Sequence, residues 1–182
     1  MRWVLLIVVV SLCSSCLYVV HKNFTLPLKG YVKNNSLKMN GYYLHQRKED
    51  SYRLFLFYDN GIAYDVHFGL GYLKSEGVDS FVAKRILPNV SRLADWKNPG
   101  AFRIKDNKIE INMVHHTHYN WHRVTEYRGT ILSDTTFMIT SDYEPKVYPE
   151  RNDTLVFHFV PGPKPDSTNN NFVLHRKWYR GK

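Results

Sequence analysis

The chain lacks cysteine almost entirely. Only Cys13 and Cys16 occur among its 182 residues, and a disulfide between them would close too small a loop to brace a fold. The chain also lacks the Gly-x-Ser-x-Gly, phosphate-loop and dinucleotide motifs of common enzyme classes. The folded part therefore has to be held by its own core, and the length of the chain suffices for one ordinary domain.

Long apolar runs are also scarce, and the one that is present stands at the N-terminus. Arg2 precedes the uncharged residues 3–12, and the small residues Ser14 and Ser15 follow before Cys16. This order of charge, short apolar segment and small residues is typical of a secretory signal peptide. Cleavage before Cys16 would make that cysteine the new N-terminus. The result resembles the lipobox of bacterial lipoproteins, whose thiol receives a diacylglyceryl anchor.

This interpretation divides the chain into a signal peptide (1–15), a lipidated N-terminus and tether (16–35), and a single folded domain (36–182). Cys13 departs from the Leu, Val or Ile that usually stands three residues before a lipobox cysteine. Two alternatives stay open: an uncleaved anchor, because residues 3–20 just reach the length of a spanning helix, and ordinary secretion.

Acidic residues are fewer than basic ones. Lys and Arg number 25 against 16 acidic residues, which gives a net charge of +9. A basic excess suggests anionic neighbours such as lipid headgroups or polyanionic glycans. The basic residues are scattered and not gathered in one stripe, so nucleic acid is not an expected partner. The expected partners are a membrane, through the anchor on Cys16, and a small amphipathic or anionic ligand. The oligomeric state is not predicted.

What the chain does have is a high aromatic content, 15% with 13 Tyr, and such residues favour strands. Strand-like runs bounded by turn residues lie at 39–46, 52–58, 62–68, 123–132, 135–140, 155–160 and 172–179. Asn60-Gly61 predicts a hairpin between the second and third runs, because both residues tolerate positive φ. Residues 101–114 alternate polar and apolar side chains around Asp106-Asn107, which predicts another hairpin.

Helical spacing of apolar residues occurs only at residues 78–87, with Asp79 or Ser80 as a cap and Pro88 as a stop. Eight or nine short strands with hairpin connections predict an all-β fold: an antiparallel up-and-down barrel with one short helix. A strongly coiled sandwich is the alternative. The barrel is favoured because closure removes exposed edge strands.

Four stretches carry a resemblance to a known family. They are LKMNGYY (37–43), LFYDNGIAY (56–64), WKNPGAFRIKDNKIEI (96–111) and KPDSTNNNFVLHRKWY (164–179). In order and spacing they resemble small lipocalin-like lipoproteins of Gram-negative bacteria. The resemblance implies a calycin-type barrel. After Cys16 stands Leu17 and not an aspartate, and no early acidic run follows; these two absences favour the periplasmic face of the outer membrane. Many members have no known activity, so the resemblance assigns no catalytic residue.

A histidine cluster is the one group of residues with a chemistry of its own. In MVHHTHYNWH (113–122), His116 and His118 project to the same face of an extended strand. His122 could return as a third ligand for zinc or copper. An exposed polar loop is the favoured alternative, because no acidic or cysteine ligand stands at a fixed spacing nearby. We predict no cofactor.

The acidic residues give no catalytic pattern. Asp65, Asp142 and Glu144 match the ordinary scatter of loop acids, and a glycosidase pair cannot be read from their spacing. We therefore expect a membrane-anchored envelope protein, not an enzyme, that binds a small amphipathic or anionic molecule or serves a structural role. Such a barrel either fills its interior with side chains, which we favour, or holds one small ligand. A protein-interaction module and a His-cluster metal-binding protein are the alternatives.

Overall fold

A computed structural model describes residues 24–26, 31, 35–48, 51–69, 77–89, 98–116, 122–144, 148–151 and 154–163. The strands in these residues are β1 (Gly41–Lys48), β2 (Ser51–Phe57), β3 (Ile62–Gly69), β4 (Asn98–Lys105), β5 (Lys108–His116), β6 (His122–Ser133), β7 (Thr136–Glu144), β8 (Tyr148–Arg151) and β9 (Leu155–Pro161). The strands predicted between residues 39 and 160 are confirmed, with small shifts of their ends. The strand predicted at 172–179 and the anchor residue Cys16 lie outside the described residues.

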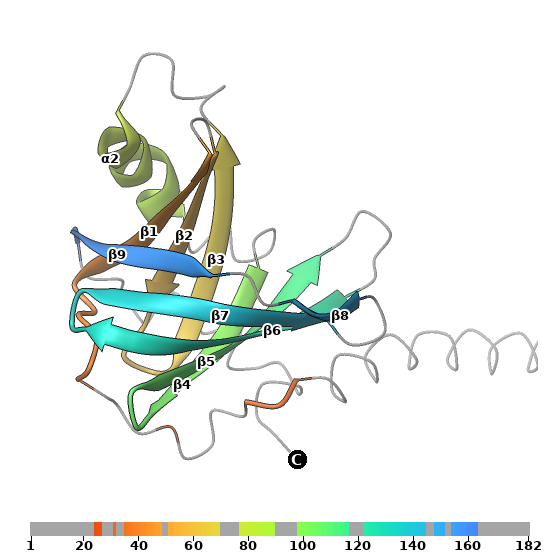
Figure 1. Ribbon diagram of the computed structural model, residues 1–182. Coiled ribbons are helices and arrows are strands. Elements are labelled where there is room, and N and C mark those ends of the chain that lie inside the picture. Colours follow the sequence, from red (N-terminus) through yellow and green to blue (C-terminus); the bar gives the residue numbers. More distant parts are fainter. Residues whose placement is uncertain are drawn as a thin grey trace, which may run out of the picture.

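The strands form a closed antiparallel barrel (Figure 1). Each strand from β1 to β7 pairs with the next one along the chain, and β9 pairs with both β1 and β7. The ring therefore contains eight strands, and β8 pairs with the end of β7 beside it. The predicted all-β, up-and-down barrel is confirmed, and the sandwich alternative is excluded.

Two tight turns show how the local sequence sets the register. Asp106 and Asn107 have φ values of 49° and 60°, so both adopt the left-handed conformation of a two-residue hairpin turn. In the β2–β3 turn only Gly61 has a positive φ, 84°. The Asn60 side-chain oxygen instead accepts a hydrogen bond of 3.3 Å from the Ile62 N–H. That turn is thus a three-residue loop with glycine at its left-handed position.

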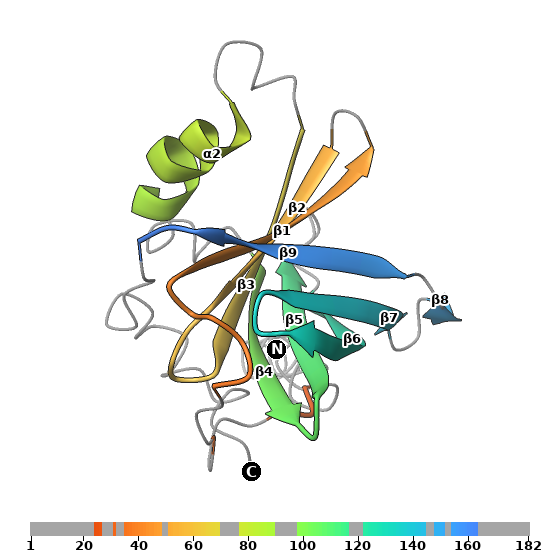
Figure 2. The same ribbon diagram turned by 60° about the vertical axis from the view of Figure 1, so that its left-hand side comes forward.

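The predicted helix is confirmed as one helical segment on the outside of the barrel, made of α2 (Val78–Phe81), η2 (Val82–Ile86) and η3 (Leu87–Asn89). It lies beside β1, β2 and β3 (Figure 2). Val82 and Ile86 are buried against the outer-face side chains of these strands. The predicted caps are wrong: the N-cap is Gly77, with no side-chain cap, and Asp79 instead accepts a 2.8 Å hydrogen bond from the Tyr42 hydroxyl. Burial and this bond raise the pKa of Tyr42.

Aromatic side chains fill one half of the barrel interior. We call them the aromatic core: Tyr43, Phe55, Phe57, Phe102, Phe137 and Phe157. None is more than 2% exposed, and neighbouring ring centroids lie 4.7 to 6.1 Å apart. Offset and edge-on pairs at these separations add to the stabilisation from burial. The expectation of a filled interior is therefore confirmed for this half.

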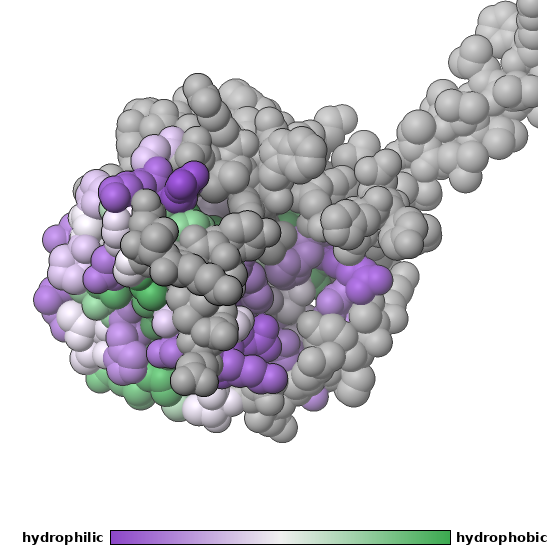
Figure 3. All heavy atoms as spheres, turned by 90° about the horizontal axis from the view of Figure 1, so that it is seen from above, coloured by the Kyte–Doolittle hydropathy of each residue, from purple (hydrophilic) through white to green (hydrophobic). Residues whose placement is uncertain are grey.

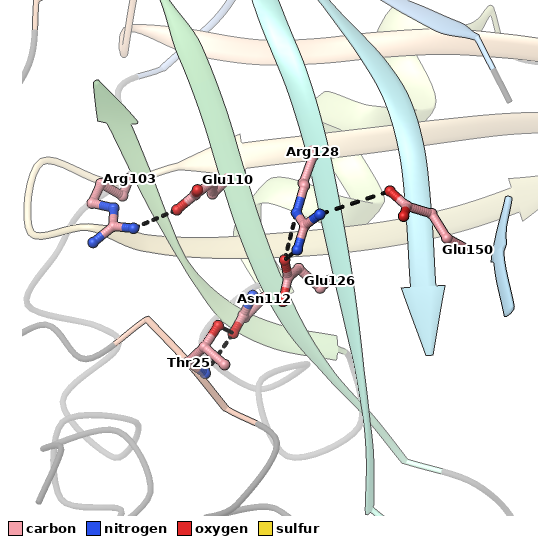
Figure 4. Close-up of polar contacts among 7 residues, drawn as sticks. All are labelled: Thr25, Arg103, Glu110, Asn112, Glu126, Arg128 and Glu150. Carbon is pink, nitrogen blue, oxygen red and sulfur yellow. Dashed lines mark hydrogen bonds and ion pairs between the residues drawn. The ribbon is translucent and has the colours of Figure 1, made fainter. Parts of the chain in front are cut away.

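Residues before β1 also pack on the barrel. Phe24 and Leu26 are buried in the outer cluster that includes Ala101 and Val114. Between them, the backbone N–H and the hydroxyl of Thr25 donate hydrogen bonds of 2.7 and 2.9 Å to the side-chain oxygen of Asn112 (Figure 4). The sequence predicted a tether for residues 16–35, but these described residues of that range are attached to the wall.

The short strand β8 contains a proline. It begins at Tyr148, and Pro149 follows. Asp142 pairs with Arg151 in the β7–β8 ladder. Proline is tolerated in such an edge strand, because one side of the strand needs no N–H donor.

Candidate functional site

The barrel has two different ends, and the candidate site lies at the end we call the mouth. The turns β2–β3, β4–β5 and β6–β7 gather at the opposite, closed end, because successive antiparallel strands reverse direction. The strand ends at the mouth are those on either side of the β1–β2 turn and of the connections β3–β4 (residues 70–97) and β5–β6 (residues 117–121). Long connections on a rigid barrel are common places for binding residues.

A buried ion pair marks the border between the aromatic core and the mouth. Arg53 on β2 is 4% exposed, and Asp65 on β3 is fully buried. The Arg53 guanidinium donates two hydrogen bonds to the Asp65 carboxylate, at 3.0 and 2.6 Å. It also lies over the rings of Phe55 and Tyr127, at 4.9 and 4.4 Å from their centroids. The pair thus places full charges directly above an apolar core.

Burial alone would raise the pKa of Asp65, but its neighbours outweigh that effect. The Arg53 charge, a hydrogen bond from His67 and the bonds from Arg53 hold the pKa of Asp65 well below its usual range. In the same way, burial disfavours the Arg53 cation, while the Asp65 charge raises the pKa of Arg53. Both side chains are therefore ionised at neutral pH. The prediction that Asp65 is an ordinary loop acid is wrong.

Two histidines extend this polar cluster toward the mouth. The imidazole Nε2 of His67 lies 3.1 and 3.2 Å from the two carboxylate oxygens of Asp65, while its side chain stays 44% exposed. Across the barrel, the imidazole Nε2 of His115 lies 3.4 Å from the Tyr127 hydroxyl. His115 follows Met113 by two residues on β5, so it lies on the same, inward face.

A pocket opens at the mouth beside this cluster, between the β1–β2 hairpin and the start of β9. This mouth pocket has a volume of about 550 Å³ and is lined by His45, Arg47, Lys48, Ser51, Thr154 and Leu155. His45 is the register partner of Arg53, so the pocket lies next to the buried ion pair. No carboxylate is among the lining residues that the structure describes.

On the outer face of β4, β5 and β6, the arginines form ion pairs with glutamates (Figure 4). Arg103 contacts Glu110 at 2.6 Å, and Arg128 contacts Glu126 at 2.6 Å and Glu150 at 3.8 Å. Each of these arginines is neutralised within the protein.

The mouth cations have no such partners within the described residues. There, Arg47 and Lys48 form no ion pair with a carboxylate. The acidic turn residues Glu49 and Asp50 lie outside the described part of the chain.

The wall of the mouth at β7 is acidic. Glu144 is 7% exposed and forms an ion pair of 3.3 Å with Arg123. Asp142 is the register partner of the inward-facing Tyr127 and thus faces the interior too. Both acids belong to strand β7, so the prediction that they are loop acids is wrong.

The predicted metal ligands are only partly described. The backbones of His116 and His122 lie opposite each other at the end of the β5–β6 hairpin, but their side chains are outside the described set. His118 also lies outside it, as does the lipidation candidate Cys16. Among the side chains that are described, no group of three or more His, Cys, Asp or Glu is arranged to hold a metal ion. The zinc or copper site stays a prediction.

The described outer surface is mixed in character. Seen from above, hydrophilic side chains are interspersed with small hydrophobic patches (Figure 3). The large hydrophobic side chains most exposed in the described residues are Leu132, near the closed end, and Tyr143, near the mouth. They lie at opposite ends of the barrel and form no common patch. No helix in the described ranges is both long enough and apolar enough to cross a membrane.

Sequence reasoning missed His45, Arg47, Lys48 and the Arg53–Asp65 pair. A signal for the pair was present, since Arg53, Phe55 and Phe57 share one strand face, as do Ala63 and Asp65. A charge at an inward position of each neighbouring strand predicts a buried pair. Nothing comparable in the sequence marks the pocket, which depends on how the β1–β2 hairpin and β9 diverge.

We compared the chain with protein-family models, with curated proteins and with solved structures, and none of the three comparisons found a match.

Proposed function

We propose that the protein binds a small anionic or amphipathic molecule in the mouth pocket and catalyses no reaction on it. The observation that supports this proposal is a pocket of about 550 Å³ whose described lining includes Arg47, Lys48 and His45 and contains no carboxylate. Its volume falls within the range of small-molecule sites. Cations without a protein counter-charge attract an anion from solution and favour its binding.

The pocket also offers apolar contact, which suits an amphipathic ligand. Leu155 lines it, and the methylene stem of Lys48 can cover apolar surface while its ammonium group stays in water. The aromatic core fills the closed half of the barrel, so a ligand has its place at the mouth and not deep inside.

The first test uses two fluorescent probes that differ in one charged group. 8-Anilinonaphthalene-1-sulfonate is an anion, and N-phenyl-1-naphthylamine is its neutral analogue. We expect the full chain to bind the anion more tightly. The variant Arg47→Gln/Lys48→Gln should weaken anion binding about tenfold and leave the neutral probe unaffected, because each exposed charge contributes up to about 1 kcal/mol.

The matched control is Lys105→Gln/Lys108→Gln in the β4–β5 hairpin at the closed end, which removes the same net charge from a pair of register partners. It should leave the affinity for the anion unchanged. Equal weakening by both double variants would indicate a general charge effect and would contradict a site at the mouth. Equal affinity of the unaltered chain for the anionic and the neutral probe would also contradict an anion site at the mouth.

We also propose that the chain is held at a membrane by a lipid on Cys16, at the periplasmic face of an outer membrane. The order of Arg2, residues 3–12 and the small residues before Cys16 supports this proposal. Multiple acyl chains give stable anchoring where one does not. Intact mass measurement of protein extracted from membranes tests it. We expect a chain that begins at Cys16 and carries fatty acyl groups; residues 1–15 still attached would contradict it.

A further inference from the structure

The hydrogen bonding of His45 restricts what the mouth pocket can accept. Its Nδ1 lies 2.7 Å from the backbone carbonyl oxygen of Val156 on β9, and its ring lies against Phe157 with 5.2 Å between the centroids. A carbonyl oxygen only accepts hydrogen bonds. Nδ1 therefore carries a hydrogen in both charge states of the ring.

The other ring nitrogen then has a fixed role in each state. When the imidazole is neutral, Nε2 has a lone pair and can only accept a hydrogen bond; when it is protonated, Nε2–H can only donate. Within the described residues, Nε2 of His45 has no hydrogen-bond partner. A neutral His45 thus presents a lone pair in a pocket whose other polar groups, on Arg47, Lys48, Ser51 and Thr154, all offer donors.

We infer that binding of a fully ionised anion in the mouth pocket takes up one proton at Nε2 of His45, so that the pocket captures such anions more tightly as the pH falls. This inference rests on the proposed function, since it requires the anion to occupy this pocket. Protonation replaces a lone pair that repels the anion with a charge-assisted hydrogen bond, one of the stronger kinds. His45 is then a specificity-determining residue that links affinity to pH across the range in which histidine titrates.

The described charged groups around His45 are two cations and one buried ion pair. Arg47 and Lys48 stand on the same strand, and Arg53, its register partner on β2, is paired with Asp65. Thr154 and Leu155 at the β9 wall carry no charge. The described pocket wall that His45 shares with Arg47 and Lys48 is therefore cationic. Glu49, Asp50 and Asp153 lie outside the described residues.

Two other histidines are natural comparisons. His67 is bonded to a carboxylate, Asp65, and not to a carbonyl, so it already has an anionic partner. His158 stands on β9 opposite Leu44, whose side chain packs on the outer face, so His158 points away from the pocket. Neither is among the described residues that line the pocket, so both serve as controls.

The test follows binding of 8-anilinonaphthalene-1-sulfonate, whose sulfonate stays ionised throughout, to the full chain between pH 8 and pH 5.5. We expect affinity to rise about tenfold on acidification, because the protonated ring adds one charge-assisted hydrogen bond to the anion. Calorimetry at pH 7 in buffers of different ionisation enthalpy should show net proton uptake. His45→Gln should abolish both effects, because a glutamine amide can still donate to Val156 but does not titrate. His158→Gln and His67→Gln should preserve them.

The outcomes separate the two proposals. If the probe binds with an affinity that does not change with pH, or if the pH dependence persists in His45→Gln, the inference about His45 is overturned while the mouth pocket stands. If the probe does not bind at any pH, or binds equally well to Arg47→Gln/Lys48→Gln, the proposed function itself fails.

Discussion

The two halves of the barrel interior are occupied by opposite kinds of side chain. Toward the closed end, Phe57, Phe102 and Phe137 pack ring against ring and are almost completely buried. Toward the mouth, inward-facing positions of β2 and β3 instead carry the charged residues Arg53 and Asp65. The first arrangement is held by apolar burial and shape. The second depends on each charge keeping its partner, because an unpaired buried charge is strongly unfavourable.

This difference indicates that the two halves of the barrel have different roles. The closed half is packed with buried aromatic rings, which stabilise the fold, whereas the mouth half holds charges that the proposed function assigns to ligand recognition. Sites that hold unpaired or strained groups for function are commonly supported by well-packed structure elsewhere. The following predictions test whether the two halves differ in this way.

The largest effect is expected in the aromatic core. Phe137 is fully buried and touches Tyr43, Phe55, Phe57 and Phe157. Phe137→Ala should lower the free energy of unfolding by about 4 kcal/mol, through lost burial and the cavity left behind. Urea denaturation measures it. Leu132→Ala, in the same hairpin but 54% exposed, is the control and should change stability little. A loss near 1 kcal/mol for Phe137→Ala would mean that the closed half is loosely packed.

The next effect concerns the ion pair. Asp65→Asn leaves the Arg53 guanidinium buried without a counter-charge, so it should cost about 3 kcal/mol of unfolding free energy. The double variant Arg53→Met/Asp65→Leu removes both charges and should be more stable than Asp65→Asn. If the double variant is the less stable of the two, the pair stabilises the barrel in its own right, and the contrast between the halves is weaker than we infer.

The stability of the protein in acid tests whether Asp65 at the mouth is held ionised. The pKa of Asp65 is depressed in the folded protein, whereas an unfolded aspartate titrates near about 3.9. As the pH falls below about 4, the unfolded chain binds a proton that the folded one does not, so stability falls until the folded pKa is passed. Unfolding free energies between pH 5 and pH 2 should therefore decline more steeply for the wild type than for Arg53→Met/Asp65→Leu. Parallel curves would mean that Asp65 is not held ionised.

The sequence predicted the closed half better than the mouth. Alternating side chains around Asp106-Asn107 and the glycine at Gly61 reflect local rules, so strands and turns could be read directly. The prediction for Asp65 was wrong because a single acid within an apolar run gives no sign of its partner. Only the pairing of β2 with β3 places Arg53 beside it. The mouth pocket combines His45 and Leu155, more than a hundred residues apart in the chain, and only the β1–β9 pairing brings them together. Local patterns carry no information about such pairings.

The smallest effect is expected for the pocket cations. Arg47 and Lys48 are exposed and form no ion pair with the described carboxylates, so Arg47→Gln/Lys48→Gln should change the free energy of unfolding by less than about 0.5 kcal/mol. The same substitutions are expected to weaken anion binding about tenfold. Urea denaturation at neutral pH, run beside the probe titration, separates the two quantities. A stability loss above about 1.5 kcal/mol would show that these cations hold the hairpin in place, and weaker binding would then reflect a displaced β1–β2 hairpin and not a lost attraction. A stable variant that no longer binds the anion would place recognition at the mouth and stability elsewhere in the barrel.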